Sequence, residues 1–142
     1  MNNDMTGEKG RIKIISFGFK YGPPNANHYF DVSFTTNPAR QERWGMFGIV
    51  DHEMIEFVLS QPKVKEFIKR VVPLIEFAAT VDAYHVVAFG CNSGRHRSPI
   101  IANEVARILS KGIPIVVEHR DLPEYEKFVY SIAHGDPGKE TR

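Results

Sequence analysis

Apolar residues recur with two different periods along this chain of 142 residues, and the two periods predict strands and helices in turn. Alternating β-branched and aromatic positions predict a strand at 11–18, RIKIISFG, and a second at 28–34, HYFDVSF. The nearly continuous apolar run YHVVAFG at 84–90 is typical of a central strand that is covered on both faces. IPIVVEH at 113–119 predicts another strand.

The segments between these strands have the helical period. Asp51 is a predicted N-cap, because the apolar positions that follow it recur every three or four residues. The next predicted helix contains Pro73, which should kink or interrupt it. SPIIANEVARILSKG predicts a helix with Pro99 in its first turn and Gly112 at its end, and 122–134 predicts a final helix.

Strands that alternate with helices predict an α/β fold. We expect one three-layer domain with a mostly parallel sheet that spans residues 1–142. Residues 1–10 and 135–142 are polar and rich in glycine and charge, so both ends are expected to be flexible. The polar connection TTNPARQERWGMFG at 35–48 is long, and long ordered loops often carry function.

Composition narrows the class of protein. The apolar fraction of 42 % and the charged fraction of 25 % are ordinary for a globular domain. The apolar runs are too short to cross a bilayer, no secretory signal is visible, and a single cysteine excludes an internal disulfide. These features predict a cytoplasmic protein with no membrane association. The six histidines show no metal-ligand spacing, so neither a metal nor a cofactor is predicted.

The stretch FGCNSGRHRS at 89–98 joins a predicted strand to a predicted helix. Free N–H groups and the helix dipole converge at such a junction and favour an anion. A glycine permits the tight path of the loop, an arginine offers a bidentate fork to a phosphate, and the final serine can cap the helix or donate to the loop. The predicted phosphate-binding residues are Cys91, Asn92, Ser93, Gly94, Arg95, His96, Arg97 and Ser98.

The spacing Cys-x5-Arg-Ser resembles the signature loop of cysteine-dependent protein phosphatases. In that alternative the Cys91 thiolate attacks phosphorus, Arg97 holds the equatorial oxygens and Asp121 protonates the leaving group. Those enzymes usually carry histidine directly before the cysteine, where this chain has Gly90. The simpler interpretation is that Cys91 is a small buried residue at the end of a strand.

Four stretches together resemble the C-terminal domain of the RapZ (YvcJ-like) proteins. They are ISFGFKYG at 15–22, FDVSFTTNP at 30–38, GCNSGRHRS at 90–98 and EHRDL at 118–122. The resemblance implies a freestanding adapter domain that binds a phosphorylated amino sugar, such as hexosamine 6-phosphate, or RNA, or both, rather than a phosphatase. No G-x-x-x-x-G-K-[ST] motif is present in the sequence, so ATP binding is not implied.

Six further residues are predicted to contact a ligand or RNA. Lys20 and Tyr21 follow the first predicted strand, and the ligand crevice of a parallel sheet lies at that end of its strands. An acid in the apolar second strand either pairs with an arginine of the anion loop or faces outward. The six residues are Lys20, Tyr21, Asp31, Asn37, His119 and Arg120.

The net charge of +1 limits what the chain can bind as a whole. A chain with so little net charge releases few counterions when it binds a nucleic acid, so RNA binding would require a localised basic patch or a homo-oligomer. Three hypotheses follow from the sequence: a phosphate-binding regulatory domain, a cysteine-dependent phosphatase, and an interaction domain without a ligand.

Overall fold

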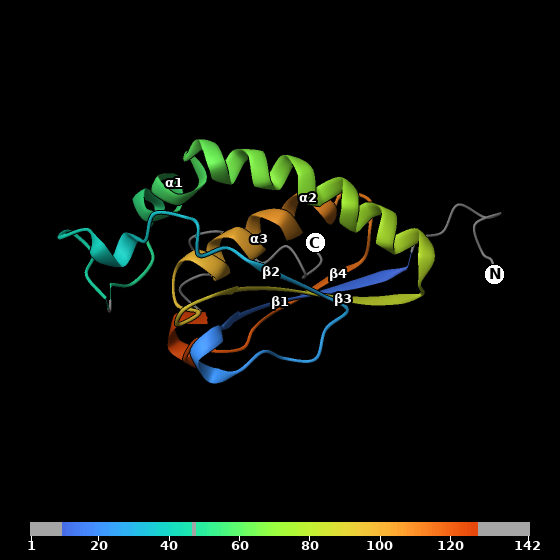
Figure 1. Ribbon diagram of the computed structural model, residues 1–142, viewed down its shortest axis with the longest axis horizontal. Coiled ribbons are helices and arrows are strands. Elements are labelled where there is room, and N and C mark those ends of the chain that lie inside the picture. The colour runs from blue at the N-terminus through green and yellow to red at the C-terminus, as the bar shows by residue number, and fades with distance from the viewer. Residues whose placement is uncertain (1–9, 47, 128–142) are drawn as a thin grey trace.

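The computed structural model describes residues 10–46 and 48–127 (Figure 1). Its sheet has the order β2-β3-β1-β4, and every neighbouring pair of strands is parallel. The four strands are β1 (Arg11–Gly18), β2 (His28–Asp31), β3 (Tyr84–Cys91) and β4 (Ile115–His119). The predicted α/β domain with a parallel sheet is therefore confirmed.

Three α-helices pack on one face of this sheet (Figure 1). They are α1 (His52–Leu59), α2 (Pro62–Val81) and α3 (Arg97–Leu109). Two short 3₁₀ helices precede them, η2 (Phe19–Tyr21) and η3 (Pro38–Arg40). On the opposite face, Phe17 packs with Phe19 and a small cluster includes Ala26, so in the described residues the segment 19–27 covers that face in place of helices.

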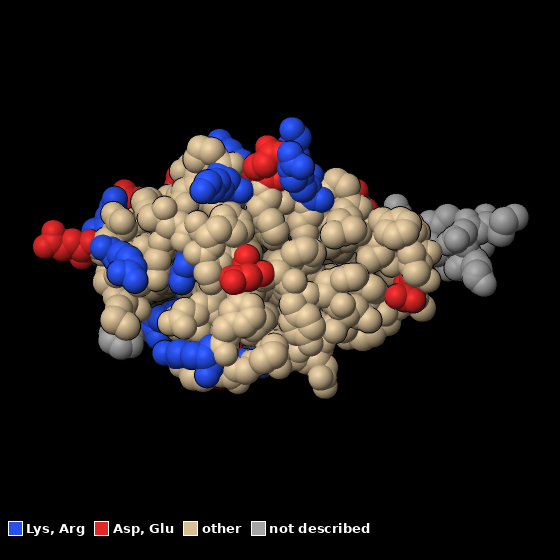
Figure 2. Space-filling view, in the orientation of Figure 1, with Lys and Arg blue, Asp and Glu red and all other residues tan. Residues whose placement is uncertain are grey.

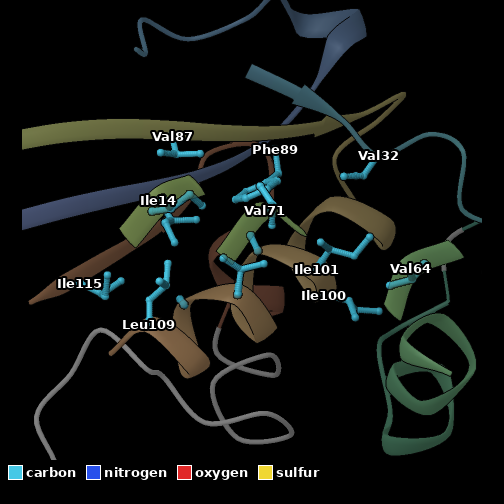
Figure 3. Packing of buried hydrophobic residues seen from close by; sticks show 14 of the residues in the cluster. Ile14, Val32, Val64, Val71, Val87, Phe89, Ile100, Ile101, Leu109 and Ile115 are labelled. Carbon is cyan, nitrogen blue, oxygen red and sulfur yellow. The ribbon is translucent and has the colours of Figure 1, made fainter. Parts of the chain in front are cut away.

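The core lies between the helices and the sheet, and α3 is at its centre (Figure 3). Nine of the 13 residues of α3 are buried, because the helix contacts the sheet on one side and α1 and α2 on the other. A helix enclosed in this way must be apolar around most of its circumference. Ile100 and Ile101 at its start are both fully buried. This packing fixes the N-terminus of α3 near the carboxyl ends of β1 and β3.

Some boundaries differ from those predicted. β2 ends at Asp31 rather than at residue 34, because its carboxylate accepts from the N–H of Ser33 (2.9 Å) and turns the chain. α2 continues through Pro73 without interruption. Pro73 is exposed, so the backbone carbonyl that the proline leaves without a helical donor can be solvated.

The C-terminal half also departs from prediction in places. α3 ends at Leu109, so Gly112 lies beyond the helix and does not end it. The predicted final helix begins in the described residues, where 124–127 are helical. Residues 128–134 of that helix lie outside the described residues, as do the predicted flexible ends apart from Gly10.

Asp51 caps α1, as the sequence predicts, through a hydrogen bond from the N–H of Met54 (2.7 Å) to its carboxylate. We expect Asp51→Ala to lower the free energy of unfolding by about 1 kcal/mol, since an N-terminal donor of the helix loses its partner. Urea denaturation measures this change. Glu56→Ala alters an exposed acid of the same helix and serves as the control. Equal losses in the two variants would contradict the capping role.

Candidate anion-binding site

Two glycines bring the loop after β3 against the end of β1. A Cβ atom on Gly94 would lie 2.6 Å from the backbone nitrogen of Gly18, and one on Gly18 would lie 2.8 Å from the nitrogen of Gly94. Gly94 also has a φ of 73°, a conformation that other residues rarely adopt. The two backbones are therefore in direct contact, which no larger residue at either position would permit.

Hydrogen bonds hold this contact in place. The N–H of Lys20 donates to the carbonyl of Asn92 (3.1 Å). The hydroxyl of Ser98 donates to the carbonyl of Phe17 (3.2 Å), and the Cys91 thiol donates to the Ser98 oxygen (3.3 Å). Ser98 thus lies inside the first turn of α3 and ties it to β1, rather than capping the helix.

The loop and the first turn of α3 present backbone donors. In the described part of the chain, no oxygen accepts from the N–H of Asn92, Ser93, Gly94, Arg97 or Ser98. The positive end of the α3 dipole lies at the same place, because α3 begins at Arg97. This is the arrangement that favours an anion at a helix N-terminus.

A cavity of about 410 Å³ lies beside the loop. Residues from η2, η3, the following connection and the loop line it, although they are far apart in the sequence. The lining residues are Lys20, Asn37, Ala39, Arg40, Met46, Cys91, Asn92, Ser93, His96 and Arg97. The structure therefore brings seven of the sequence-predicted residues to one cavity.

The cavity is lined by positive charge. Lys20, Arg40 and Arg97 line it, and none of its described lining residues is acidic. The guanidinium of Arg97 donates to the carbonyls of Ser33 (3.0 Å) and Thr35 (3.4 Å), which orients it. Figure 2 shows Lys and Arg gathered at the end of the molecule where residues 19–21 and 38–46 lie.

A family model, the RapZ C-terminal domain, matches residues 10–123. The chain belongs to this family. Similar proteins include one from Rubrobacter xylanophilus, 39 % identical over 122 residues, and one from Desulfovibrio desulfuricans, 39 % identical over 119 residues. A third, from Pseudothermotoga lettingae, is 35 % identical over 117 residues. The resemblance seen in the sequence is confirmed.

These relatives are all named nucleotide-binding protein, and they are longer than this chain. The matches cover 78 %, 79 % and 78 % of this chain but 40 %, 38 % and 42 % of the relatives, respectively. The chain therefore spans about two fifths of the length of the proteins that it matches.

His96 combines burial with a place in the cavity wall. It is 4 % exposed, and its Nε2 donates to the carbonyl of Gly48 (2.6 Å). Burial lowers the pKa of His96 below the ordinary value of 6.5, and the charges of Arg95 and Arg97 lower it further, while the bond to Gly48 opposes them. At neutral pH His96 is therefore an uncharged donor that holds the backbone at Gly48 against the loop.

Several predicted contacts have structural partners outside the cavity. Arg95 forms an ion pair with the buried Glu126. His119 bridges the hydroxyl of Ser16 (2.7 Å) and the side-chain oxygen of Asn103 (2.9 Å), which links β4 to β1 and α3. These two side chains therefore support the site without lining it.

Arg120 and Asp121 form a second supporting pair. Arg120 donates to Asp121 and to the carbonyl of Gly22 (2.6 Å), which holds the segment after η2. Asp121 accepts from the N–H of Gly18 (2.7 Å) as well. Both of its oxygens therefore accept from N–H donors, and it does not line the cavity.

Asp31 and Tyr21 also lie outside the cavity lining. Asp31 is exposed and accepts from Ser33, and among the described residues it pairs with no arginine of the loop. This corresponds to the outward-facing alternative. Tyr21 is exposed beside Lys20, whose ammonium lies 5.3 Å from the ring centroid.

Sequence reasoning missed Ala39, Arg40 and Met46, which also line the cavity. They lie in the polar connection after β2, whose length predicts a functional loop but not which of its residues face a ligand. The side chain of Asn37 accepts from the N–H of Ala39 (3.0 Å) and caps η3. An asparagine before Pro38, with an arginine three residues after it, was the available local signal.

In the described ranges, no helix is long and apolar enough to cross a membrane. Over the same residues, no three histidine, cysteine or acidic side chains lie close enough together to hold a metal ion.

The glycine contact can be tested with Gly94→Ala. We expect a loss of at least about 2 kcal/mol in the free energy of unfolding, because a left-handed conformation and a backbone clash are both imposed on alanine. Gly112→Ala is the matched control, since a Cβ there meets no atom within 4 Å. Thermal and urea denaturation compare the two, and a Gly94→Ala variant as stable as Gly112→Ala would contradict the contact.

The buried histidine predicts a pH dependence. Because folding lowers the pKa of His96, the unfolded chain binds more protons between that lowered value and 6.5, so this residue makes stability fall as pH falls through the window. His96→Gln retains a donor for Gly48 but cannot titrate. Denaturation from about pH 7 to about pH 5 should cost the variant less stability than the parent. Parallel losses would contradict a neutral, buried His96.

Proposed function

We propose that this domain binds a phosphorylated small molecule in the cavity and acts as a regulatory adapter. One observation carries the proposal: available backbone N–H groups and three cationic side chains occur at the same cavity, and none of its described lining residues is acidic. The phosphate binds to the backbone of the loop 91–98 and to the guanidinium of Arg97, because charge-assisted hydrogen bonds are stronger than those between neutral groups. The remaining volume accommodates the body of a small ligand.

A phosphorylated sugar fits the lining better than a nucleotide does. Asn37, Asn92 and Ser93 offer polar groups to hydroxyls. The described lining residues include no phenylalanine, tyrosine or tryptophan on which a base could stack, and the imidazole of His96 is buried and held by Gly48. Hexosamine 6-phosphate is the ligand that the family resemblance implies. The relatives' name, nucleotide-binding protein, applies to chains of which this one matches only about two fifths.

Cys91 is proposed to be a wall of the phosphate cradle and not a nucleophile. It is 2 % exposed, and its thiol donates to Ser98. Phosphate transfer would also need an acid for the leaving group. Asp121, the acid that the phosphatase alternative requires, is bound to Gly18 and Arg120. No turnover of phosphate esters is expected.

RNA is a second candidate ligand, because one observation favours it. Tyr21 is 59 % exposed and carries Lys20 over its ring, and Lys20 also lines the cavity. An exposed aromatic beside a cation is a platform for a base and its phosphate. A homo-oligomer would repeat this platform and raise the local charge that a single copy of the chain lacks.

The phosphate site is tested by Arg97→Ala. Calorimetry with inorganic phosphate and hexosamine 6-phosphate should show binding weakened by about 1.5–3 kcal/mol, the value of a hydrogen bond to a charged group. Cys91→Ser should bind as the parent does, and neither protein should hydrolyse an aryl phosphate. A short structured RNA, titrated in parallel, tests the second candidate.

Arg107→Ala removes the same side chain from the exposed end of the same helix and is the control. Hydrolysis that disappears in Cys91→Ser would replace the proposal with the phosphatase. Binding that is lost in Arg107→Ala but not in Arg97→Ala would contradict the assignment of the site.

A further inference from the structure

His96 is a titratable side chain in the wall of the cavity. It is buried, and its Nε2 carries a proton, because this nitrogen donates to the carbonyl of Gly48 (2.6 Å). A second proton therefore binds at Nδ1 and makes the ring a cation. Burial disfavours that cation and lowers the pKa of His96 below 6.5, the bond to Gly48 opposes this change, and the charges of Arg95 and Arg97 lower the pKa further. Near neutral pH the wall therefore contains an uncharged ring that a proton converts to a cation.

The other charged groups of the described lining are positive. Lys20 comes from η2, Arg40 from η3 and Arg97 from the first turn of α3. Cys91 lines the cavity as well, and its thiol donates to the Ser98 oxygen. A protonated imidazole would add a further positive charge to this lining, and repulsion between like charges disfavours it.

Acidic side chains in the segments around the loop lie outside the described cavity lining. Each of them accepts a hydrogen bond, forms an ion pair or is exposed at the surface. These acids are Asp31, Glu42, Asp51, Glu53, Asp121 and Glu126. An anionic ligand therefore brings to the cavity the negative charge that its described lining lacks. In a space of about 410 Å³ this charge lies close to the His96 ring, and salt screens charges at a partly buried site less than at the surface.

We infer that anion binding in the cavity is coupled to the uptake of a proton by His96, so that the site holds an anion more tightly as the pH falls. This inference rests on the proposed phosphate site and adds a regulatory property to it. The coupling is reciprocal, because the bound anion stabilises the imidazolium by the same free energy with which the imidazolium stabilises the anion.

The sign of the pH dependence follows from this linkage. A bound anion raises the pKa of His96 above its value in the free domain, which burial has lowered. Between the two values the bound domain holds more protons than the free domain does, so affinity rises as the pH falls through that window. Each pKa unit between the two values contributes about tenfold to the affinity.

Sulfate is the probe, because it keeps its full charge over the range in which a phosphate monoester, with a pKa of about 6, changes its own. Calorimetry of the whole chain with sulfate, in buffers that differ in their enthalpy of ionisation, measures the protons taken up per ion bound. We expect about 0.3 to 1 proton at about pH 6. The dissociation constant should fall about threefold or more from about pH 7.5 to about pH 5.5.

Two variants assign the proton. His96→Gln keeps a donor for Gly48 but cannot titrate, so it should take up no proton, and its sulfate affinity should not change over this range. His52→Gln removes an exposed histidine of α1 that does not line the cavity, and it should behave as the parent does. Thermal denaturation confirms that each variant is folded. NMR titration of the His96 ring in the parent, with and without sulfate, measures the same coupling without any substitution.

The outcomes distinguish this inference from the function on which it rests. Sulfate binding without proton uptake by the parent overturns the coupling and leaves the phosphate site standing. Uptake that persists in His96→Gln, or that is lost in His52→Gln, overturns the assignment to His96. Failure of both sulfate and inorganic phosphate to bind the parent at every pH overturns the proposed function and this inference with it.

Discussion

The backbone contact between Gly18 and Gly94 is the constraint on which the site depends. It places the loop after β3 directly on the end of β1, so the first turn of α3 lies close enough for Ser98 to reach the carbonyl of Phe17. The N–H of Gly18 donates to Asp121, which follows β4, so the carboxyl end of β4 is held at the same point. The carboxyl ends of β1, β3 and β4 and the first turn of α3 therefore meet at Gly18 and Gly94, which have no side chains.

The same packing explains why the loop differs from a phosphatase loop at Gly90. A Cβ on Gly90 would lie 2.5 Å from the Cζ atom of Phe17 and 2.7 Å from a ring carbon of Phe19. The two aromatic rings cover the face of the sheet opposite the helices. A histidine before Cys91 would therefore displace the residues that close this face. Gly90 is dictated by aromatic packing and needs no explanation from catalysis.

The sequence predicted the part of the site that is continuous in the chain. Strand periodicity predicted the bounds of β1. The glycine, arginine and serine of the 89–98 stretch indicated a strand-loop-helix, because the conformation and role of each depend mainly on its neighbours in the sequence. Arg40 and Met46 could not be found in this way, since the connection that holds them has no period and its path depends on contacts such as His96 with Gly48. The roles of His119 and Asp121 were also hidden, because a strand end shows which residues are near the crevice but not which way they point.

In the described part of the domain, the basic side chains around the loop fall into two groups: some form ion pairs that hold neighbouring segments, and others line the cavity. Arg95 and Arg120, which the sequence placed with the anion loop, are paired with Glu126 and Asp121 and hold the surrounding segments. Lys20, Arg40 and Arg97 have no such acids. Like charges that line one cavity repel one another, so the fold bears a cost that an anionic ligand would remove. Ligand binding and stability are then coupled, and a bound anion should raise the stability of the domain with the logarithm of the anion concentration once that concentration exceeds the dissociation constant.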